Sequence, residues 1–426
     1  MNKTVICLLV LAVTLSASPV FSQSKPAENS VLSALIKEAL ENNPRLEAAV
    51  QRMLATEKVI PQAGALPDPQ LTLGLMNLPV NSFAFDQEPM TGKLISLMQM
   101  FPFPGKQALA TDMAEYEASA VMFQQEEVRN QIIQMVKWTY YDLYALDRAR
   151  ETVEKNKALM EQFVQVTEIK YATGSGLQQD VLRAQVELSK LEDDLTMWQQ
   201  KRAAGTARLN ALLNRDQGSP FELTPKDLAL PEDPLPLVSL SGVEERRPLL
   251  KAWKEKMDRA EAAVELARRD YWPNFTVGAS YSQRDNLASG MKMYDFFSFT
   301  VSLNIPLYYK RKQGAKVAEK ELDETAVAAE YENARAGVLA EIESLKADLE
   351  RNKKRVELYQ GGILLQAQQS LESALAGYQV GKVDFLTLIN NWMMVENYEL
   401  QYFFALADYH KALAGYELAV GGEITE

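Results

Sequence analysis

Apolar and polar residues alternate along residues 296–306. One parity holds Phe297, Phe299, Val301, Leu303 and Ile305, and the other holds Ser298, Thr300, Ser302 and Asn304. Because a strand points successive side chains to opposite faces, the pattern predicts a strand with one apolar and one small, polar face. About 9–11 alternating residues is also the length of a tilted strand that crosses a bilayer. By itself the pattern fits both an amphipathic strand on a soluble core and a membrane-barrel strand.

A period of seven residues replaces this alternation in the longest segments. Residues 107–171 contain neither Pro nor Gly, which predicts one helix on the order of 95 Å long. Its seven-residue series is Ile132, Thr139, Leu146, Val153 and Met160, and the second half has Val338, Ile342, Leu345, Leu349, Asn352, Val356, Tyr359 and Ile363. Such repeats predict long helices packed side by side. The first helix carries a second apolar stripe, formed by Ile133, Val136, Tyr140 and Tyr144, so we expect a neighbour on each side of it.

The chain contains two similar halves, offset by about 204–207 residues. Residues 69–74 match residues 273–278, and a Tyr-x-x-Gly motif recurs at Tyr171–Gly174 and Tyr378–Gly381. Each half therefore predicts a helix, two strands, a long helix, a tight turn and a returning helix. The expected strands are Gln70–Leu78, Lys93–Phe101, Asn274–Arg284 and Phe296–Ile305.

The segments on either side of the repeats have their own composition. Lys3 and the apolar run Val5–Leu15 predict a secretory signal peptide over residues 1–22, cut after Ser22. The first repeat is expected at 23–213, a proline-rich connector at 214–240, the second repeat at 241–420 and a tail at 421–426. No later segment offers about 20 uninterrupted apolar residues, so no transmembrane helix is expected.

Composition removes several classes of function. The net charge of −12 argues against a nucleic-acid partner. The only Cys is Cys7 and the only His is His410, which excludes a disulfide framework and a Cys/His zinc site. We find no nucleophile–base pair, phosphate loop or metal-ligand cluster, so we expect no enzyme activity, no cofactor and no metal site.

The signal peptide, duplicated halves, strand pairs and paired Tyr-x-x-Gly turns resemble the outer-membrane efflux proteins of the TolC family, also called outer membrane factors. The resemblance covers about Val31–Val420. Residues 101–106, with Pro67-Asp68-Pro69 before them, are most similar to the heavy-metal efflux (CzcC/CusC-like) branch. The implied fold is mainly α with a small β part. Duplicated helical hairpins form a periplasmic helical barrel, and four transmembrane strands per chain contribute to a trimeric twelve-stranded β-barrel.

The number of copies also follows in part from strand arithmetic. Four strands cannot close a barrel, and an open edge in lipid is prohibitively costly. Two, three or four copies give about 8, 12 or 16 strands, and a barrel of eight is filled by its own side chains. A conduit therefore needs at least three copies, and the resemblance selects three.

The resemblance implies a passive exit duct in the outer membrane, in contact with its lipid, for heavy-metal or drug efflux. Its partners would be a periplasmic adaptor (membrane fusion) protein and an inner-membrane pump of the RND type. A soluble periplasmic coiled-coil scaffold or adaptor is the alternative function. The polar parity of residues 298–304 argues against that alternative.

The tip positions of the family correspond here to Tyr171, Gly174, Tyr378 and Gly381, which are candidates for adaptor contact. Their alternative role is to form the helix turns and nothing more.

Family members often carry a carboxylate ring nine and twelve residues after the second tip tyrosine. This chain has Thr387 and Asn390 there, which is a departure from the family pattern. Asp384 lies one helical turn before Thr387, and Asp180 holds the equivalent place in the first half. Three copies of either aspartate would form a cation-attracting constriction. Both are alternatively explained as acidic residues favoured at helix N-termini.

Two further features have open interpretations. Six methionines lie near the strands and their loops, where they fit either apolar filling or soft Cu(I) ligands. They are Met76, Met90, Met98, Met100, Met291 and Met293. The pair Gly361-Gly362 interrupts the second long helix about two turns before its end, as a tolerated weak point or a hinge.

Overall fold

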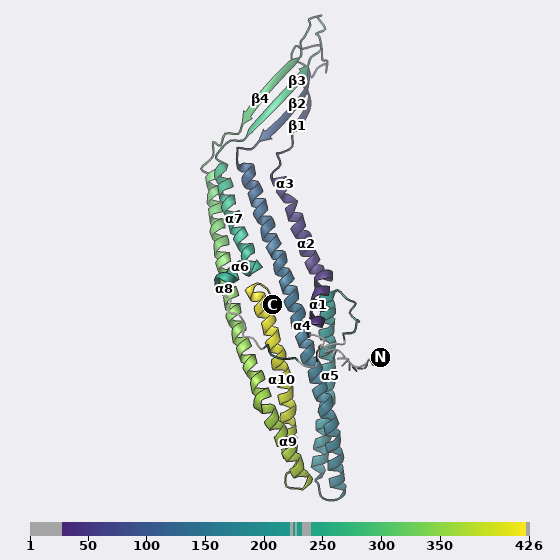
Figure 1. The fold of residues 1–426 in the computed structure, drawn as a ribbon. Helices are drawn as coiled ribbons and strands as arrows, with labels where there is room; N and C mark the ends of the chain where they lie inside the picture. Colours follow the sequence, from purple (N-terminus) through teal and green to yellow (C-terminus); the bar gives the residue numbers. More distant parts are fainter. Residues whose placement is uncertain (1–27, 222–224, 226–227, 232–239, 423–426) are drawn as a thin grey trace, which may run out of the picture.

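The computed structural model of the protein describes residues 28–221, 225, 228–231 and 240–422. The predicted signal peptide, residues 232–239 of the connector and residues 423–426 of the tail lie outside this range. The described chain is a long rod, with a small β-sheet at one end and the turns of two helical hairpins at the other (Figure 1).

The two halves repeat the same order of helices and strands. The elements are α1 (Glu28–Asn42), α2 (Pro44–Glu57), α3 (Val59–Ala63), β1 (Gln70–Met76), β2 (Gly92–Phe101), α4 (Lys106–Ala172), α5 (Gln178–Leu213), α6 (Leu240–Arg246), α7 (Pro248–Arg269), β3 (Phe275–Gln283), β4 (Phe296–Leu303), α8 (Gln313–Leu358), the π-helical segment η1 (Tyr359–Ile363), α9 (Leu364–Gln379) and α10 (Phe385–Val420). Each predicted strand is confirmed, with its ends within two residues of the expected ones.

The four strands form one antiparallel sheet in the order β1-β2-β3-β4, so β2 and β3 join the two halves. The register aligns small polar side chains in a row across all four strands: Thr72, Ser96, Ser280 and Ser298. The next row, on the opposite face, holds Leu73, Ile95, Tyr281 and Phe297. These two rows show that the polar and the apolar face of β4 each continue across all four strands.

Strand β2 is the one whose sequence alternates poorly. Leu94, Met98 and Met100 share the parity of Ser96 and therefore lie on the polar face. Their partners across the strand pair are small or polar residues of β3: Ser282, Gly278 and Thr276. A Cβ at Gly278 would lie 3.0 Å from Cγ of Met98, so the glycine leaves room for the larger side chain.

Helix α4, with 67 residues, is the central helix of the rod and packs on α2, α5, α7 and α10. Every residue of its predicted seven-residue series is buried. In its second stripe Val136, Tyr140 and Tyr144 are buried as well, which agrees with neighbours on two sides. Helix α8 packs on α7 and α10 in the second half.

Shorter helices meet end to end halfway along the rod. Asn43 caps the start of α2 by accepting a hydrogen bond from the Arg45 backbone N–H (2.9 Å), and it donates to the Leu212 carbonyl in the last turn of α5 (2.8 Å). The matching residue of the second half, Arg247, precedes α7 and donates to the Leu418 carbonyl near the end of α10. Each joint thus adds a side-chain hydrogen bond to a carbonyl in the last turn of a helix, and the Leu418 carbonyl also accepts from the Gly421 N–H (3.1 Å).

The second joint is also tied to α4 by charge. Arg247 pairs with Glu127 of α4 at 2.8 Å, and both side chains are almost fully buried. The interior of the rod therefore contains a paired charge at the point where α4, α7 and α10 meet.

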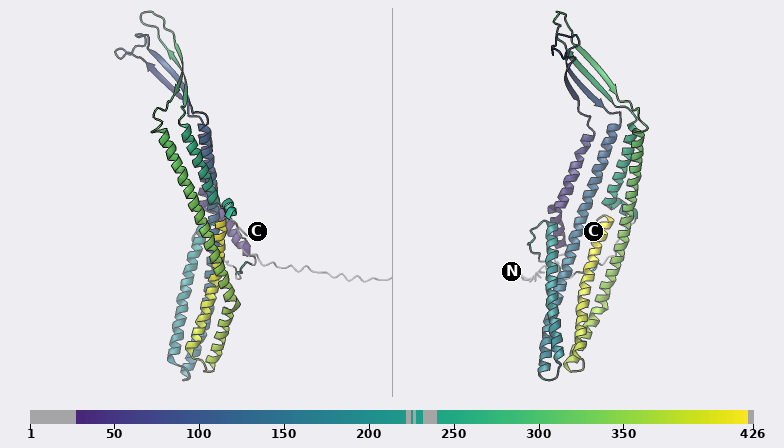
Figure 2. Two further views of the ribbon diagram at one scale, coloured as in Figure 1. Left: turned by 90° about the vertical axis from the view of Figure 1, so that its left-hand side faces the viewer. Right: turned by 180° about the vertical axis from the view of Figure 1, so that it is seen from behind.

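The Gly361-Gly362 pair lies in η1, and α8 and α9 run in different directions on either side of it (Figure 2). Tyr359 anchors this segment, because its buried hydroxyl bonds to the Gln401 side chain of α10. The position expected for the pair, about two turns before the helix end, is wrong: α9 continues for 16 residues beyond it. A π-helical turn shifts the hydrogen-bond pattern and bends the helix there.

Candidate functional site

The two hairpin tips close with the same backbone geometry. Gly174 and Gly381 both have φ of 72°, a left-handed conformation that glycine adopts without steric cost. The Gly174 N–H donates to the Tyr171 carbonyl (3.0 Å), and the Gly381 N–H donates to the Tyr378 carbonyl (3.2 Å). In both turns the tyrosine therefore accepts the bond that ends the helix, as in glycine-terminated helices generally.

The tyrosine side chains of the two tips lie in different environments. Tyr171 is 49% exposed, whereas Tyr378 is 5% exposed and packs in a core that α4, α5, α9 and α10 share. Its ring centroid lies 5.5 Å from that of Phe385 at the start of α10. Two residues that align as equals in the sequence thus differ in what they can contact.

Lys170 connects the two tips. Its Nζ donates to the Tyr378 carbonyl at 2.8 Å and lies 4.3 Å from the centroid of the Tyr378 ring. The Tyr378 hydroxyl is buried without a hydrogen-bond partner among the described residues. Burial, and then the charge of Asp180, raises the pKa of this hydroxyl. Lys170, Tyr378 and Asp180 therefore form one contact between the first and the second hairpin.

The other constriction candidates lie along α10. Asp384 caps this helix by accepting a hydrogen bond from the Thr387 backbone N–H (2.7 Å), and hydrogen bonds from the Thr387 side chain and backbone lower the pKa of its carboxyl. Asp384, Thr387 and Asn390 are exposed on the first turns of α10. Asp180 is separate from this row, since it lies in the first turn of α5 beside Tyr378.

An acidic cluster farther along α10 has no motif that would reveal it. Glu396 follows the apolar run 392–395, and its pKa is raised to about 7 by burial and then by the charges of Asp194, Glu399 and Glu187. Two of those neighbours have cationic partners: Lys155 lies 3.0 Å from Glu399, and Lys190 lies 2.9 Å from Glu187. The only feature of the sequence that points to this cluster is a glutamate on the buried side of an apolar helix.

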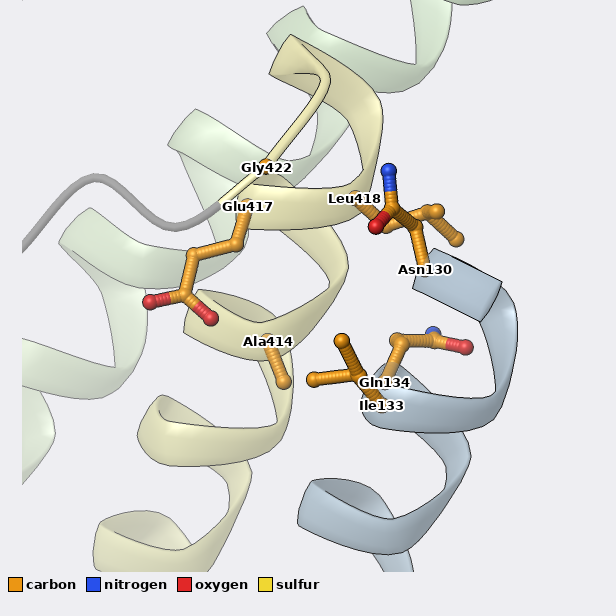
Figure 3. Close-up of a pocket in the computed structure, with 7 residues that line it drawn as sticks. All are labelled: Asn130, Ile133, Gln134, Ala414, Glu417, Leu418 and Gly422. Atoms are coloured by element: carbon orange, nitrogen blue, oxygen red, sulfur yellow. The ribbon is translucent and has the colours of Figure 1, made fainter. Parts of the chain in front are cut away.

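A cavity of ≈ 380 Å³ adjoins this acidic cluster, and Lys155, Gln368 and Glu399 are among the residues that line it. A cavity between α4 and the end of α10 has a volume of ≈ 20 Å³, and Figure 3 shows Ile133 directed toward Ala414 within it. That space suits about one water molecule.

No group of three or more His, Cys, Asp or Glu side chains in the described ranges could hold a metal ion. None of the helices within those ranges is both long and apolar enough to span a membrane. Among the methionines, Met76, Met98 and Met100 share the polar face of the sheet, and Met90 and Met291 are exposed in the loops beyond it.

Comparison with known proteins identifies the family. The model of the outer membrane efflux protein family matches residues 35–215 and 240–422. The chain belongs to the outer membrane efflux protein family.

Individual relatives match most of this chain. The chain is 23% identical to the outer membrane protein TolC of Vibrio cholerae over 366 residues, which are 83% of this chain and 82% of TolC. It is 21% identical to the cobalt-zinc-cadmium resistance protein CzcC of Cupriavidus metallidurans over 407 residues, 95% of this chain and 93% of CzcC. The solved structure of the outer-membrane channel OprN superposes with a TM-score of 0.81 at 17% identity and covers 92% of this chain and 90% of OprN.

Family membership decides between the classes of function that the sequence left open. Outer membrane efflux proteins are transport channels and not enzymes. The protein is therefore an outer-membrane channel protein whose helical part extends into the periplasm. A soluble periplasmic scaffold is excluded, and the expected fold class is confirmed.

We expect Glu396→Gln to stabilise the channel at neutral and alkaline pH. As the pH rises from 4.5 toward about 7, only the unfolded chain loses the proton of Glu396, so the wild-type free energy of unfolding falls over this window. The variant lacks this fall and should gain up to about 3 kcal/mol above it, because one pKa unit corresponds to about 1.4 kcal/mol.

Thermal unfolding of the detergent-solubilised channel at about pH 5 and about pH 8 measures this effect. The control is Glu372→Gln, which removes an exposed carboxylate of α9 and should leave the pH dependence as it is. If Glu396→Gln kept the wild-type pH dependence, ionisation of Glu396 would not control stability.

Proposed function

We propose that three copies of this channel protein form the exit duct of a tripartite efflux system, through which substrate passes passively to the exterior. The observation that carries the proposal is the four-stranded sheet with its apolar face and two open edges. Among the residues that the structure describes, strands β1 and β4 each pair on one side only. In hydrocarbon, unpaired backbone groups cost several kcal/mol each, so β1 of one copy must pair with β4 of the next.

Three copies close a barrel of twelve strands, whereas two copies would give eight strands and a filled interior. The row Thr72, Ser96, Ser280 and Ser298 would then face the lumen, where small hydroxyl groups leave a wide, wetted passage. The row Leu73, Ile95, Tyr281 and Phe297 would face outer-membrane lipid.

The hairpin tips are the proposed contacts with a periplasmic adaptor protein, which would connect the duct to an inner-membrane pump of the RND type. Large apolar side chains stay exposed at both tips although the periplasm is aqueous; they are Ile169, Tyr171, Leu177 and Val380. Exposed apolar groups of this kind favour a protein partner. Tyr171 and Gly174 would contact the adaptor directly. Tyr378, being buried, would support the second tip from inside while Gly381 shapes its turn.

Asp384, with Thr387 and Asn390 on the following turns, is the proposed lumen-facing constriction. All three are exposed in the single chain, and the pKa of Asp384 is lowered, so it stays charged over a wide pH range. Three copies around the axis would attract cations. Asp180 is proposed to act mainly in the contact between hairpins.

Heavy-metal ions are the proposed cargo, and drug-like organic molecules are the second candidate. The observation behind the first is the similarity to CzcC, a cobalt-zinc-cadmium resistance protein, over 95% of this chain. The similarity to TolC supports an efflux duct and leaves the cargo open.

Adjacent residues of β4 provide a matched test of the two faces. Phe299→Lys places a charge in lipid, where it costs about 2–4 kcal/mol near the bilayer midplane, and should sharply reduce assembly in the outer membrane. Thr300→Lys changes the lumen face of the same strand and should assemble normally. The measurement is the amount of trimer in isolated outer membranes, and equal assembly of both variants would contradict the assigned faces.

Cells that lose the gene should become more sensitive to cobalt, zinc and cadmium salts, and the wild-type gene should restore resistance. Minimal inhibitory concentrations measure this, with a panel of organic antibiotics tested in parallel. Sensitivity to the antibiotics alone would replace metals by organic cargo, and unchanged sensitivity to both would argue against efflux.

Asp384→Asn should reduce the preference of the pore for cations, because it removes one charge per copy from the constriction. Reversal potentials in planar bilayers under a salt gradient measure the preference. Asp180→Asn is the comparison and should change it less. Unchanged selectivity in both variants would remove the two aspartates from the constriction.

A further inference from the structure

The loop between β4 and α8, residues 304–312, carries side chains that neither the fold nor the proposed duct uses. After Pro306 it reads Leu-Tyr-Tyr-Lys-Arg-Lys. Leu307 is 75% exposed and Tyr308 is 79% exposed. We call residues 304–312 the β4–α8 loop; it lies where the sheet meets the helices (Figure 1).

Lys310, Arg311 and Lys312 of this loop are exposed, and no carboxylate in the described ranges lies within ion-pair distance of them. Lysines close to the loop are paired: Lys106 and Lys316 share Asp270, at 3.1 Å and 2.7 Å. Three adjacent cations without partners therefore stand out in a chain with a net charge of −12.

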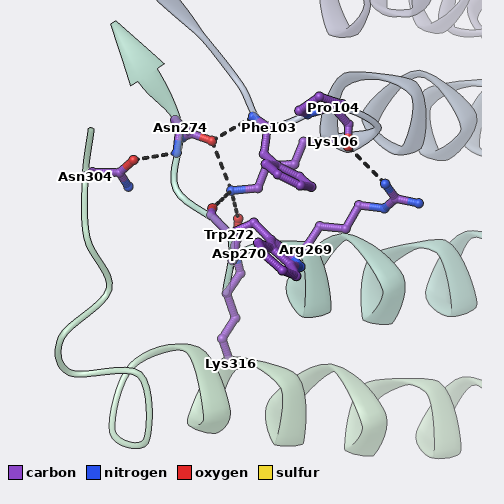
Figure 4. A network of polar contacts seen from close by, with 9 residues as sticks. All are labelled: Phe103, Pro104, Lys106, Arg269, Asp270, Trp272, Asn274, Asn304 and Lys316. Atoms are coloured by element: carbon purple, nitrogen blue, oxygen red, sulfur yellow. Dashed lines mark hydrogen bonds and ion pairs between the residues drawn. The ribbon is translucent and has the colours of Figure 1, made fainter. Parts of the chain in front are cut away.

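The first half of the chain provides an internal comparison. The corresponding connection between β2 and α4, residues 102–105, contains no charged residue, and Lys106 after it is buried. Figure 4 shows the Lys106 ammonium bound to the Trp272 carbonyl and the Asn274 side chain, at 3.1 Å and 3.0 Å. The first-half segment thus pairs its lysine within the chain, whereas the β4–α8 loop exposes three cations to the surroundings.

The β4–α8 loop has a fixed backbone. The N–H groups of Arg311 and Lys312 both donate to the Tyr308 carbonyl at 3.0 Å, and the Gly314 N–H donates to the Tyr309 carbonyl at 2.7 Å. The Tyr309 ring lies 6.3 Å from that of Tyr271, which follows α7. A preorganised loop loses little entropy when it binds a ligand.

The membrane sets where this loop lies. The apolar face of β4 ends at Leu303, and α8, which extends into the periplasm, begins at Gln313. The loop is therefore at the periplasmic surface of the outer membrane. Trp272, 57% exposed, precedes β3 at the same end of the sheet, and aromatic residues favour this interfacial depth.

We propose that the β4–α8 loop binds the phosphate groups of anionic phospholipids in the periplasmic leaflet. Lys310, Arg311 and Lys312 pair with headgroup phosphates, since clustered cations at a membrane surface are attracted by anionic lipid. Leu307 and Tyr308 enter the boundary between headgroups and acyl chains. This site depends on the membrane position of the sheet and not on export of any substrate.

A neighbouring copy of the chain is a weaker candidate for the same surface. If β1 of that copy pairs with β4, its residues 64–69 come nearest to the loop, and their only charged residue is Asp68. One carboxylate cannot neutralise three cations, so lipid phosphate remains the better match in charge.

The test uses the purified full-length channel in neutral detergent and short-chain phosphatidylglycerol as the probe. We expect native mass spectrometry to detect bound lipid, and Lys310→Gln/Arg311→Gln/Lys312→Gln to weaken binding by about tenfold or more. The control Lys353→Gln/Lys354→Gln/Arg355→Gln removes the same number of charges near the end of α8, far from the sheet. It should bind lipid like wild type. Tyr308→Ser, which keeps the charges, should weaken binding less.

The remaining arms separate the possible ligands. Phosphatidylcholine, whose choline cancels the phosphate charge, should bind more weakly, and glycerol phosphate at equal concentration should not compete. Equal binding by the loop variant and wild type, equal losses in both triple variants, or competition by glycerol phosphate would each overturn the proposal. Loss of trimer without loss of lipid binding would assign the loop to contact between copies instead.

Discussion

The backbone groups along the outer edges of β1 and β4 set the constraint on which the rest of the structure depends. The sheet has an apolar face that continues over four strands, and no other strand in the described part of the chain pairs with its two edges. A lipid environment does not tolerate unpaired edges, so the sheet is complete only as part of a closed assembly. Helix α4 has buried residues on more than one side because α2, α5, α7 and α10 of the same chain pack around it.

A rod of this length needs helix ends in its interior, and each half solves that problem with a different side chain. Asn43 is neutral and joins α2 to Leu212 of α5. Arg247, at the matching position, reaches Leu418 of α10 and brings a charge with it, and Glu127 of α4 neutralises that charge. Removal of one partner would leave the other charge buried and unpaired, which is more costly than the loss of a surface ion pair. The second joint is therefore coupled to the central helix in a way that the first joint is not.

Much of this fold could be predicted because the relevant patterns are local. The parity of Phe297 and Ser298 reports the two faces of a strand, and the seven-residue series from Ile132 reports a buried helix face. The features that could not be predicted depend on tertiary contacts between residues far apart in the sequence. Glu396 has a raised pKa because it is buried and because α5 brings the charges of Asp194 and Glu187 toward it. Tyr378 is buried and Tyr171 is exposed, although the same motif surrounds both. The π-helical turn at Gly361-Gly362 begins at Tyr359, whose hydroxyl bonds to Gln401 of the distant helix α10.

Differences between matched positions of the two halves separate side chains that pack within the chain from side chains that stay exposed. In one half, a charged side chain has its partners within the chain, and these contacts explain its presence. Lys106, bound to Asp270 and Asn274, is the example. Where the matching segment stays exposed and unpaired, as in the β4–α8 loop, internal packing does not explain the side chains. The same reasoning applies at the tips, where Tyr378 completes a core and Tyr171 does not. Since both copies share one backbone geometry, turn formation accounts for the glycines and the tyrosine carbonyls, and it leaves the exposed ring of Tyr171 unexplained.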